Sequence, residues 1–120
     1  MGNLRPGANA SGRRSFEREM THRKPPQDCA DMSELRQAID AIDVELVKLL
    51  RDRADYIDRA VTLKQANGWP ARIQSRVEEV IANACRVAEA EGLDPQLVER
   101  IWRDMVDWSI SREAREIPET

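Results

Sequence analysis

Apolar residues recur at steps of three and four along the first long stretch of the chain, which is the spacing of one face of an α-helix. The members of this apolar stripe are Leu35, Ile39, Ile42, Leu46, Leu49, Ile57, Ala60 and Val61. Asp31, with Glu34 three residues later, forms a capping-box pattern just before the stripe. The stripe stops near Gly68 and Pro70. Gly68 suits the position just after a helix, and Pro70 prevents the helix from continuing. The pattern predicts one helix from about Ser33 to Asn67.

Two shorter helices are predicted in the remaining sequence. One begins at about Ala71 and stops at Gly92, and its apolar face comprises Ile73, Val77, Val80, Ile81, Ala84 and Ala88. The dipeptide Asp94-Pro95 then supplies an N-cap and a proline suited to the first helical position. The third helix continues until Pro118 ends it, and its apolar face comprises Leu97, Ile101, Met105 and Trp108. The predicted fold class is all-α, with one long helix and two shorter ones.

The unequal helix lengths predict an assembly. At 1.5 Å per residue the first helix is about 50 Å long, whereas each of the other two is roughly 30 to 35 Å. The shorter helices would cover about half of the long one, yet its apolar stripe continues along the whole length. A second copy of the chain is the simplest cover for the remainder. We therefore expect an intertwined or side-by-side homodimeric helical bundle.

Composition changes this picture mainly at the N-terminus. Residues 1–30 carry six cations and three acids, whereas the whole chain has a formal charge of -3. This stretch has several glycines and Phe16 as its only aromatic residue, so it is too polar to pack. We expect residues 1–27 to be a flexible basic tail, 28–117 to be the helical domain and 118–120 to be a short C-terminal tail. The cations of the N-terminal tail are too sparse for a phosphate-binding arm, so no nucleic-acid partner is expected.

Length and residue types exclude several classes of function. A chain of 120 residues has room for one domain. Cys29 and Cys85 fit neither a CxxC motif nor a disulfide framework, so both are expected to be reduced thiols. The single histidine, His22, cannot build a catalytic triad or a zinc site, and the dispersed glycines give no nucleotide signal, so neither metal nor cofactor is expected. No stretch suits a signal peptide or a membrane span, and we expect a cytoplasmic protein.

Two cations lie within the apolar face of the long helix, where unpaired charge is costly. Arg53 and Lys64 are 11 residues apart, which corresponds to about 16 Å along the helix and an angular offset of about 20°. Arg76 lies at the margin of the apolar face of the second helix. Three cations in a helical core need anions. They could pair with acids such as Glu78 or Asp104, extend towards solvent or bind an anionic ligand, and these alternatives remain open at this point.

A longer set of residues resembles a known family. The matching positions are Leu35-Arg36-Gln37-Ala38-Ile39-Asp40-Ala41-Ile42-Asp43, Leu46, Leu49-Leu50, Arg53, Lys64, Arg76, Gly92-Leu93-Asp94 and Trp108-Ser109-Ile110. With these motifs, residues 28–117 resemble the all-helical (AroQ-class) chorismate mutase family, including the related isochorismate pyruvate lyases. Most of the specificity lies in the four cations of this set, which are separated by 17, 11 and 12 residues.

The resemblance implies a dimer in which the long helices pair, and a site that binds a chorismate-like dianion. Arg53 and Arg36 of the partner subunit would hold the two carboxylates, because a guanidinium can bind a carboxylate through two hydrogen bonds. Lys64 would face the ether oxygen of the substrate. Arg76 would support a carboxylate or the outer part of the site.

The resemblance also implies substrate contacts for Val77, Ser109 and Glu113. Prototype bacterial mutases carry acids at the positions of Ile73 and Val77, and Val77 is more similar to the lyases. Glu113 aligns with a glutamine that polarises the ether oxygen, a substitution associated with fungal mutases, and it must be protonated to donate a hydrogen bond. Glu113 could instead be a surface acid, since charged residues flank it. Ser109, one turn earlier, could face either the ligand or its own helix.

Three functions follow as alternatives. The first is chorismate mutase, which supplies prephenate for aromatic amino acid biosynthesis in the shikimate pathway. It is favoured because Glu113 has a precedent among mutases and because it is the commoner activity of the fold. The rearrangement needs a folded substrate and positive charge rather than a nucleophile. The second is isochorismate pyruvate lyase, which forms salicylate and pyruvate. The third, a non-catalytic helical dimer, ranks lower because a plain bundle would place Leu or Ala at positions 53 and 64.

Overall fold

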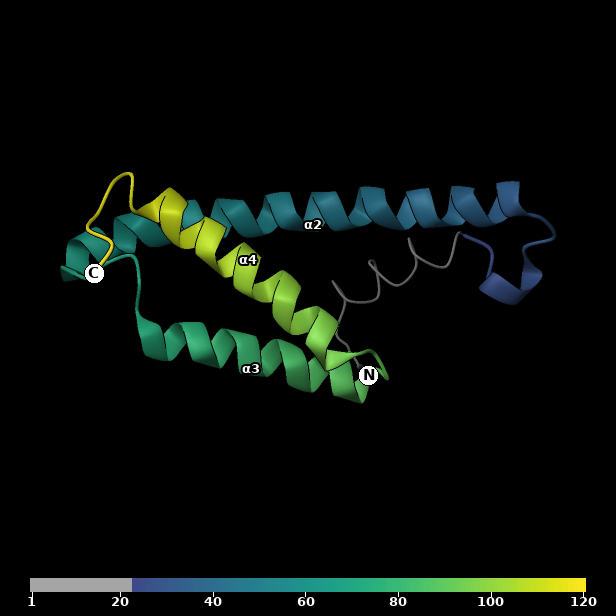
Figure 1. Cartoon of the computed structure of the whole chain (residues 1–120). Coiled ribbons are helices and arrows are strands. Elements are labelled where there is room, and N and C mark those ends of the chain that lie inside the picture. The colour runs from purple at the N-terminus through teal and green to yellow at the C-terminus, as the bar shows by residue number, and fades with distance from the viewer. Residues whose placement is uncertain (1–22) are drawn as a thin grey trace, which may run out of the picture. The chain divides into compact units, whose positions relative to one another are not determined.

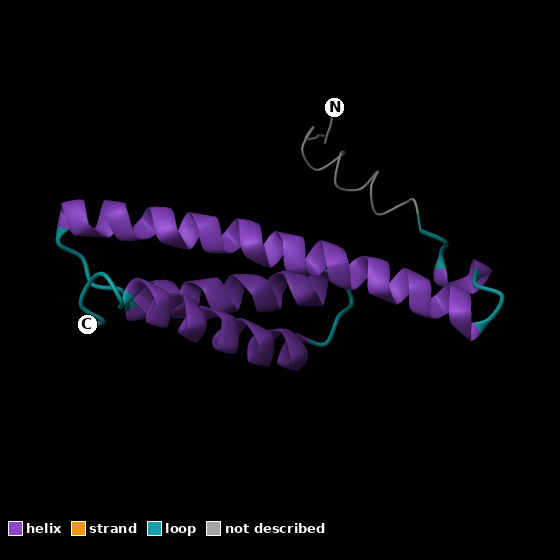
Figure 2. Cartoon of the chain, turned by 90° about the horizontal axis from the view of Figure 1, so that it is seen from above, coloured by secondary structure: helices purple, strands orange, loops and turns teal. Residues whose placement is uncertain are grey.

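The computed structural model of the chain describes residues 23–120, which contain three α-helices and one short 3-10 helix (Figure 1). In chain order these are η1 (Pro26–Asp28), α2 (Met32–Asn67), α3 (Gln74–Ala90) and α4 (Pro95–Glu113). Residues 23–120 include no β-strand, which confirms the all-α prediction (Figure 2). None of the helices described is both long and apolar enough to cross a membrane. Most of the predicted tail, residues 1–22 with His22, lies outside the described residues.

α2 begins and ends where the sequence pattern predicts. The backbone N–H of Glu34 donates to Oδ1 of Asp31 at 2.9 Å, and Oε1 of Glu34 accepts from the N–H of Ala30 at 2.8 Å. Carboxylates thereby satisfy backbone donors at the helix start, as in a capping box. At the other end Gly68 has a φ of +69°, and the N–H of Trp69 donates to the carbonyl oxygen of Lys64 at 2.9 Å. A glycine in the left-handed conformation closes the helix.

α3 begins at Gln74, three residues after the predicted start at Ala71. The N–H of Ala71 donates to the carbonyl oxygen of Pro118 at 2.8 Å, and the N–H of Arg72 donates to that of Glu119 at 2.7 Å. The predicted start is wrong because this pairing holds the residues before α3 outside the helix. Positions 118 and 119, assigned above to a C-terminal tail, contact the segment before α3.

α4 begins as predicted but buries a different face. The side chain of Asp94 accepts from the N–H of Gln96 at 2.9 Å, and Pro95 is the first helical residue. The predicted face includes Ile101 and Trp108, which are 48% and 51% exposed. The buried residues of α4 are Val98, Val106, Ser109, Ile110 and Glu113. The predicted face is wrong because apolar residues lie on both sides of this helix. α3 packs against the side that was not predicted to be buried.

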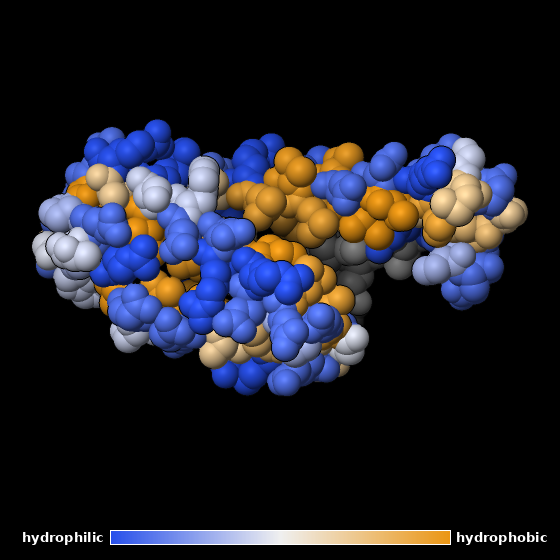
Figure 3. Space-filling view, in the orientation of Figure 1, coloured by the Kyte–Doolittle hydropathy of each residue, from blue (hydrophilic) through white to orange (hydrophobic). Residues whose placement is uncertain are grey.

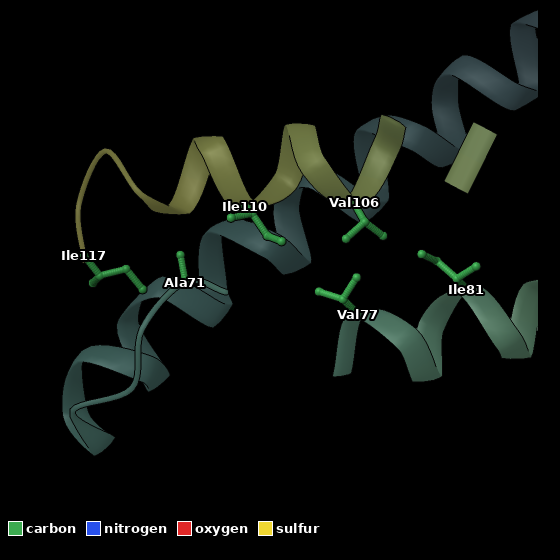
Figure 4. Close-up of a cluster of buried hydrophobic side chains, with 6 residues drawn as sticks. All are labelled: Ala71, Val77, Ile81, Val106, Ile110 and Ile117. Atoms are coloured by element: carbon green, nitrogen blue, oxygen red, sulfur yellow. The ribbon is translucent and has the colours of Figure 1, made fainter. Parts of the chain in front are cut away.

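The second unit of the chain, Arg51–Thr120, contains the core. Its buried cluster comprises Ala71, Val77, Ile81, Val106, Ile110 and Ile117 (Figure 4). Val77 of α3 faces Val106 of α4, and Val61 of α2 packs against the same cluster. Nε and Nη2 of Arg112 also donate to the two carboxylate oxygens of Asp58, at 2.5 and 2.9 Å. The C-terminal part of α2 and the helices α3 and α4 therefore surround one apolar core.

The first unit, which ends at Leu50, leaves apolar residues of α2 exposed. These exposed residues are Met32, Ile39, Val44, Leu46, Val47, Leu49 and Leu50. Figure 3 shows apolar surface along this helix. No residue of α2 is buried, which agrees with the prediction that much of the long helix is uncovered within one chain. An apolar surface of this kind is typical of an interaction site.

Candidate active site

Six of the seven predicted site residues line one pocket in the second unit. The pocket has a volume of about 230 Å³ and lies among α2, α3, α4 and the segment that precedes α3. The six residues are Arg53, Lys64, Arg76, Val77, Ser109 and Glu113. The seventh, Arg36, is exposed on α2 in the first unit and does not line this pocket. The fold thus brings together three cations that are far apart in the sequence.

Lys64 is paired with a buried acid. Its Nζ donates to Oε1 of Glu113 and to the carbonyl oxygen of Ala71, each at 2.7 Å. The side chains of Lys64 and Glu113 are 18% and 4% exposed, so this is a short, charge-assisted hydrogen bond in a largely desolvated place. The alternative in which Glu113 is a surface acid is therefore wrong. Lys64 does not pair with Glu78 either, because that acid contacts Arg103.

Arg53 has no carboxylate partner among residues 23–120. Its Nη1 donates to Oγ of Ser109 at 3.0 Å, and this hydroxyl donates to the carbonyl oxygen of Met105 at 2.9 Å. The serine proton is thus used within its own helix, while the serine oxygen accepts from the guanidinium. Burial and the nearby charge of Arg76 lower the pKa of Arg53. A bound anion would stabilise the charged form of the guanidinium in this setting.

Arg76 contributes charge at the exposed side of the pocket. Its Nη1 donates to Oε1 of Glu79 at 2.7 Å, and both side chains are well exposed. A surface pair of this kind contributes little to stability, so Arg76 can change partners at little cost. Three cations and the carboxylate of Glu113 give the pocket lining a formal charge of +2.

The rest of the pocket wall is apolar. It comprises Ile57, Ala60, Ala71, Ile73, Val77, Val80, Val106 and Ile110. Ile73 and Val77 both belong to this wall, and among residues 23–120 Glu113 is the one acid in the lining. Electrostatic interactions in such an environment are stronger than in water.

The arrangement suits electrostatic catalysis better than nucleophilic attack. The hydroxyl of Ser109 donates to a backbone carbonyl, not to a base that could activate it. Lys64 and Arg53 instead present positive charge to the pocket from one face of α2. Across the part of the chain that the structure describes, no group of three His, Cys, Asp or Glu side chains is placed to hold a metal ion.

One site group has no signal in the sequence pattern, namely the backbone carbonyl of Ala71 that accepts from Lys64. It reaches the site because the segment before α3 is not helical, which local propensity does not reveal. The burial of Glu113 did leave a signal. Val106, Ile110, Glu113 and Ile117 follow one another at steps of four, three and four residues, the spacing of one helical face.

Comparison with known proteins adds three findings. The family model described as chorismate mutase type II matches residues 35–114. The isochorismate pyruvate lyase of Pseudomonas aeruginosa is 33% identical over 93 residues, which cover 77% of this chain and 90% of that protein. The T-protein of Enterobacter agglomerans is 30% identical over 84 residues, which cover 70% of this chain and 22% of that protein.

Proposed function

Because the chain belongs to the chorismate mutase type II family, we propose that it converts chorismate to prephenate. The observation that carries this proposal is the Lys64–Glu113 pair, which lies in an apolar pocket together with Arg53. The rearrangement breaks the ether C–O bond and forms a C–C bond within one molecule. It therefore requires no nucleophile, and the protein has to fold the substrate and stabilise the charge that develops on the ether oxygen.

The charge of the pocket fits a dianion. The three cations of the lining complement two carboxylates, and the partly buried setting of Arg53 and Lys64 strengthens the attraction. In the proposed complex Arg53 binds one carboxylate through its guanidinium, held in place by Ser109. Arg76 leaves Glu79 to support a carboxylate from the exposed side, and Val77 contacts the ring.

Lys64 and Glu113 act on the ether oxygen in this proposal. The ammonium of Lys64 is attracted to the negative charge of the transition state. A protonated Glu113 donates a second hydrogen bond to the same oxygen, whereas an ionised Glu113 repels it. Both groups are positioned on rigid helices, α2 and α4, so little reorganisation accompanies the reaction.

We also propose that the protein is a homodimer whose partner completes the site. The exposed apolar residues of α2 need a cover, and Arg36 lies on the same helix outside the pocket. In the dimer, Arg36 of the partner subunit binds the second carboxylate. Light scattering at micromolar concentration checks the assembly, and a uniform monomer would exclude it.

Isochorismate pyruvate lyase is the second candidate. It is favoured by the apolar wall at Ile73 and Val77 and by the relative of that name, which matches along most of its length. The same cations would hold isochorismate while pyruvate leaves and salicylate forms. Because the same cations would serve both reactions, the two candidate functions are distinguished by testing which substrate is converted.

The test is to incubate the purified chain separately with chorismate and with isochorismate, and to identify prephenate or salicylate. Prephenate from chorismate is the expected result, and salicylate from isochorismate alone would establish the second candidate. Arg53→Ala should abolish turnover, whereas Arg59→Ala, which removes an exposed cation of the same helix outside the pocket, should not. If neither substrate is converted, the non-catalytic dimer becomes the better description.

A further inference from the structure

Lys64 is oriented by two oxygen atoms, and only one of them belongs to a side chain. Its Nζ donates to Oε1 of Glu113 and to the carbonyl oxygen of Ala71, each at 2.7 Å. An ammonium has three N–H donors, so within the described part of the chain one donor is left for a ligand. The direction of that donor depends on where the carbonyl of Ala71 lies.

The carbonyl of Ala71 is not fixed by a helix, because Ala71 lies in the segment between α2 and α3. It is fixed by the C-terminal end of the chain. The N–H of Ala71 donates to the carbonyl oxygen of Pro118 at 2.8 Å, and the N–H of Arg72 donates to that of Glu119 at 2.7 Å. Nε of Arg72 also donates to a carboxylate oxygen of Glu119 at 3.4 Å.

Residues 116–119, which we call the C-terminal strap, are anchored in the core as well. Ile117 is 7% exposed and lies beside Ala71 in the buried cluster (Figure 4). The N–H of Ile117 donates to the carbonyl oxygen of Glu113 at 3.1 Å. The strap is therefore linked to both residues that accept from Lys64.

We infer that the C-terminal strap positions Lys64 for the reaction through the carbonyl of Ala71. The inference rests on the proposed function, in which Lys64 acts on the ether oxygen. Ile117 is a positioning residue, since it lines no part of the pocket but its packing sets where the ammonium lies. A shift of about 1 Å in a catalytic group can cost about a hundredfold in rate. Because the charge on the ether oxygen develops in the transition state, the strap should affect kcat more than KM.

The test compares Ile117→Ala with Ile81→Ala. Ile81 is 4% exposed in the same core cluster but does not line the pocket, so its variant reproduces the loss of packing. Ile117→Ala should lower kcat for chorismate by about tenfold or more while KM changes less than about threefold. Ile81→Ala should lower Tm and leave kcat within about twofold, and Ile117→Val should restore most of the activity. Equal kcat values for Ile117→Ala and Ile81→Ala would overturn the inference.

A second measurement does not depend on turnover. An amine-acylating reagent modifies lysines according to their accessibility, and mass spectrometry gives the ratio of modification at Lys64 to that at Lys48. The side chain of Lys64 is 18% exposed, whereas that of Lys48 is 58% exposed. Loss of the strap in a chain ending at residue 115 should raise the ratio severalfold, while a chain ending at 119 should not. An unchanged ratio would overturn the inference, whereas a raised ratio in a chain inactive on both substrates would count against the proposed function alone.

Discussion

Removing the charge of Lys64 and removing that of Arg53 should have opposite effects on stability, although both should abolish turnover. Lys64→Met keeps the apolar stem but leaves the buried carboxylate of Glu113 without its ammonium partner. Arg53→Met likewise keeps the stem, but it leaves no acid behind, because Arg53 contacts the hydroxyl of Ser109. The two variants therefore separate a cation with a structural partner from a cation without one.

The cost of Lys64→Met can be bounded. Breaking a buried ion pair by removing one partner typically costs about 3 to 5 kcal/mol. The stranded acid can avoid this cost by taking up a proton. A glutamate in an unfolded chain titrates near pH ~4.3, and each pH unit is worth about 1.36 kcal/mol, so keeping it protonated at pH 7 costs about 4 kcal/mol. We therefore expect Lys64→Met to lower the free energy of unfolding by about 4 kcal/mol at pH 7, and by less as the pH falls.

The effect of Arg53→Met has the other sign. Burial first, and then Arg76, lower the pKa of Arg53, so the charged guanidinium is less favourable in the folded chain than in the unfolded one. Neutralising it removes this unfavourable interaction at every pH at which arginine is charged. Ser109 loses a donor but keeps its hydrogen bond to Met105. We expect an unchanged or raised Tm.

Urea unfolding at pH 7 and at about pH 5 measures both effects. The control is the double variant Lys64→Met with Glu113→Gln, which removes the stranded carboxylate and should be more stable at pH 7 than Lys64→Met alone. If Lys64→Met were as stable as the unmodified chain at pH 7, the buried pair would contribute nothing net. A loss of more than about 2 kcal/mol in Arg53→Met would mean that its charge has a structural partner.

Three further outcomes are expected. Glu113→Gln keeps the shape of the side chain and always supplies a hydrogen-bond donor, so the variant should retain turnover; loss of turnover in initial-rate measurements would show that the carboxyl group itself is required. A hydrogen bond from Arg112 lowers the pKa of Asp58, so the stabilisation is present above the ordinary carboxyl pKa and is lost in acid; the Tm difference between the chain and Asp58→Asn should shrink towards about pH 2, and a constant difference would contradict this. Deleting residues 1–27 removes the exposed Lys24–Glu34 pair and should change Tm and kcat little. Calorimetry and kinetics check this, and a loss of kcat larger than about tenfold would contradict it.

Local signals account for the parts of the fold that were predictable. The capping residues Asp31 and Glu34 and the left-handed Gly68 determine the ends of α2 through contacts within a few residues. Asp94 acts in the same way at the start of α4. Such contacts are encoded by neighbouring residues, so pattern and propensity suffice to find them.

Non-local contacts account for the errors. The start of α3 depends on Pro118, which is 47 residues from its hydrogen-bond partner Ala71. The buried face of α4 depends on which of two apolar sides meets α3, and the sequence of α4 alone contains both. A choice of this kind is made by tertiary packing.

Arg53 and Lys64 show why residue type and position on a helical face can locate a site without describing its chemistry. From the sequence, Arg53 and Lys64 are equivalent, since both are cations on one apolar face of the same helix. The fold makes them different, because α4 presents a hydroxyl to one and a carboxylate to the other. Ser109 and Glu113 are four residues apart on α4, so one turn of that helix decides which cation carries a structural ion pair. Arg53, which donates to a neutral hydroxyl, can consequently bind an anionic ligand directly, whereas Lys64 meets a ligand while it is paired with the carboxyl group of Glu113.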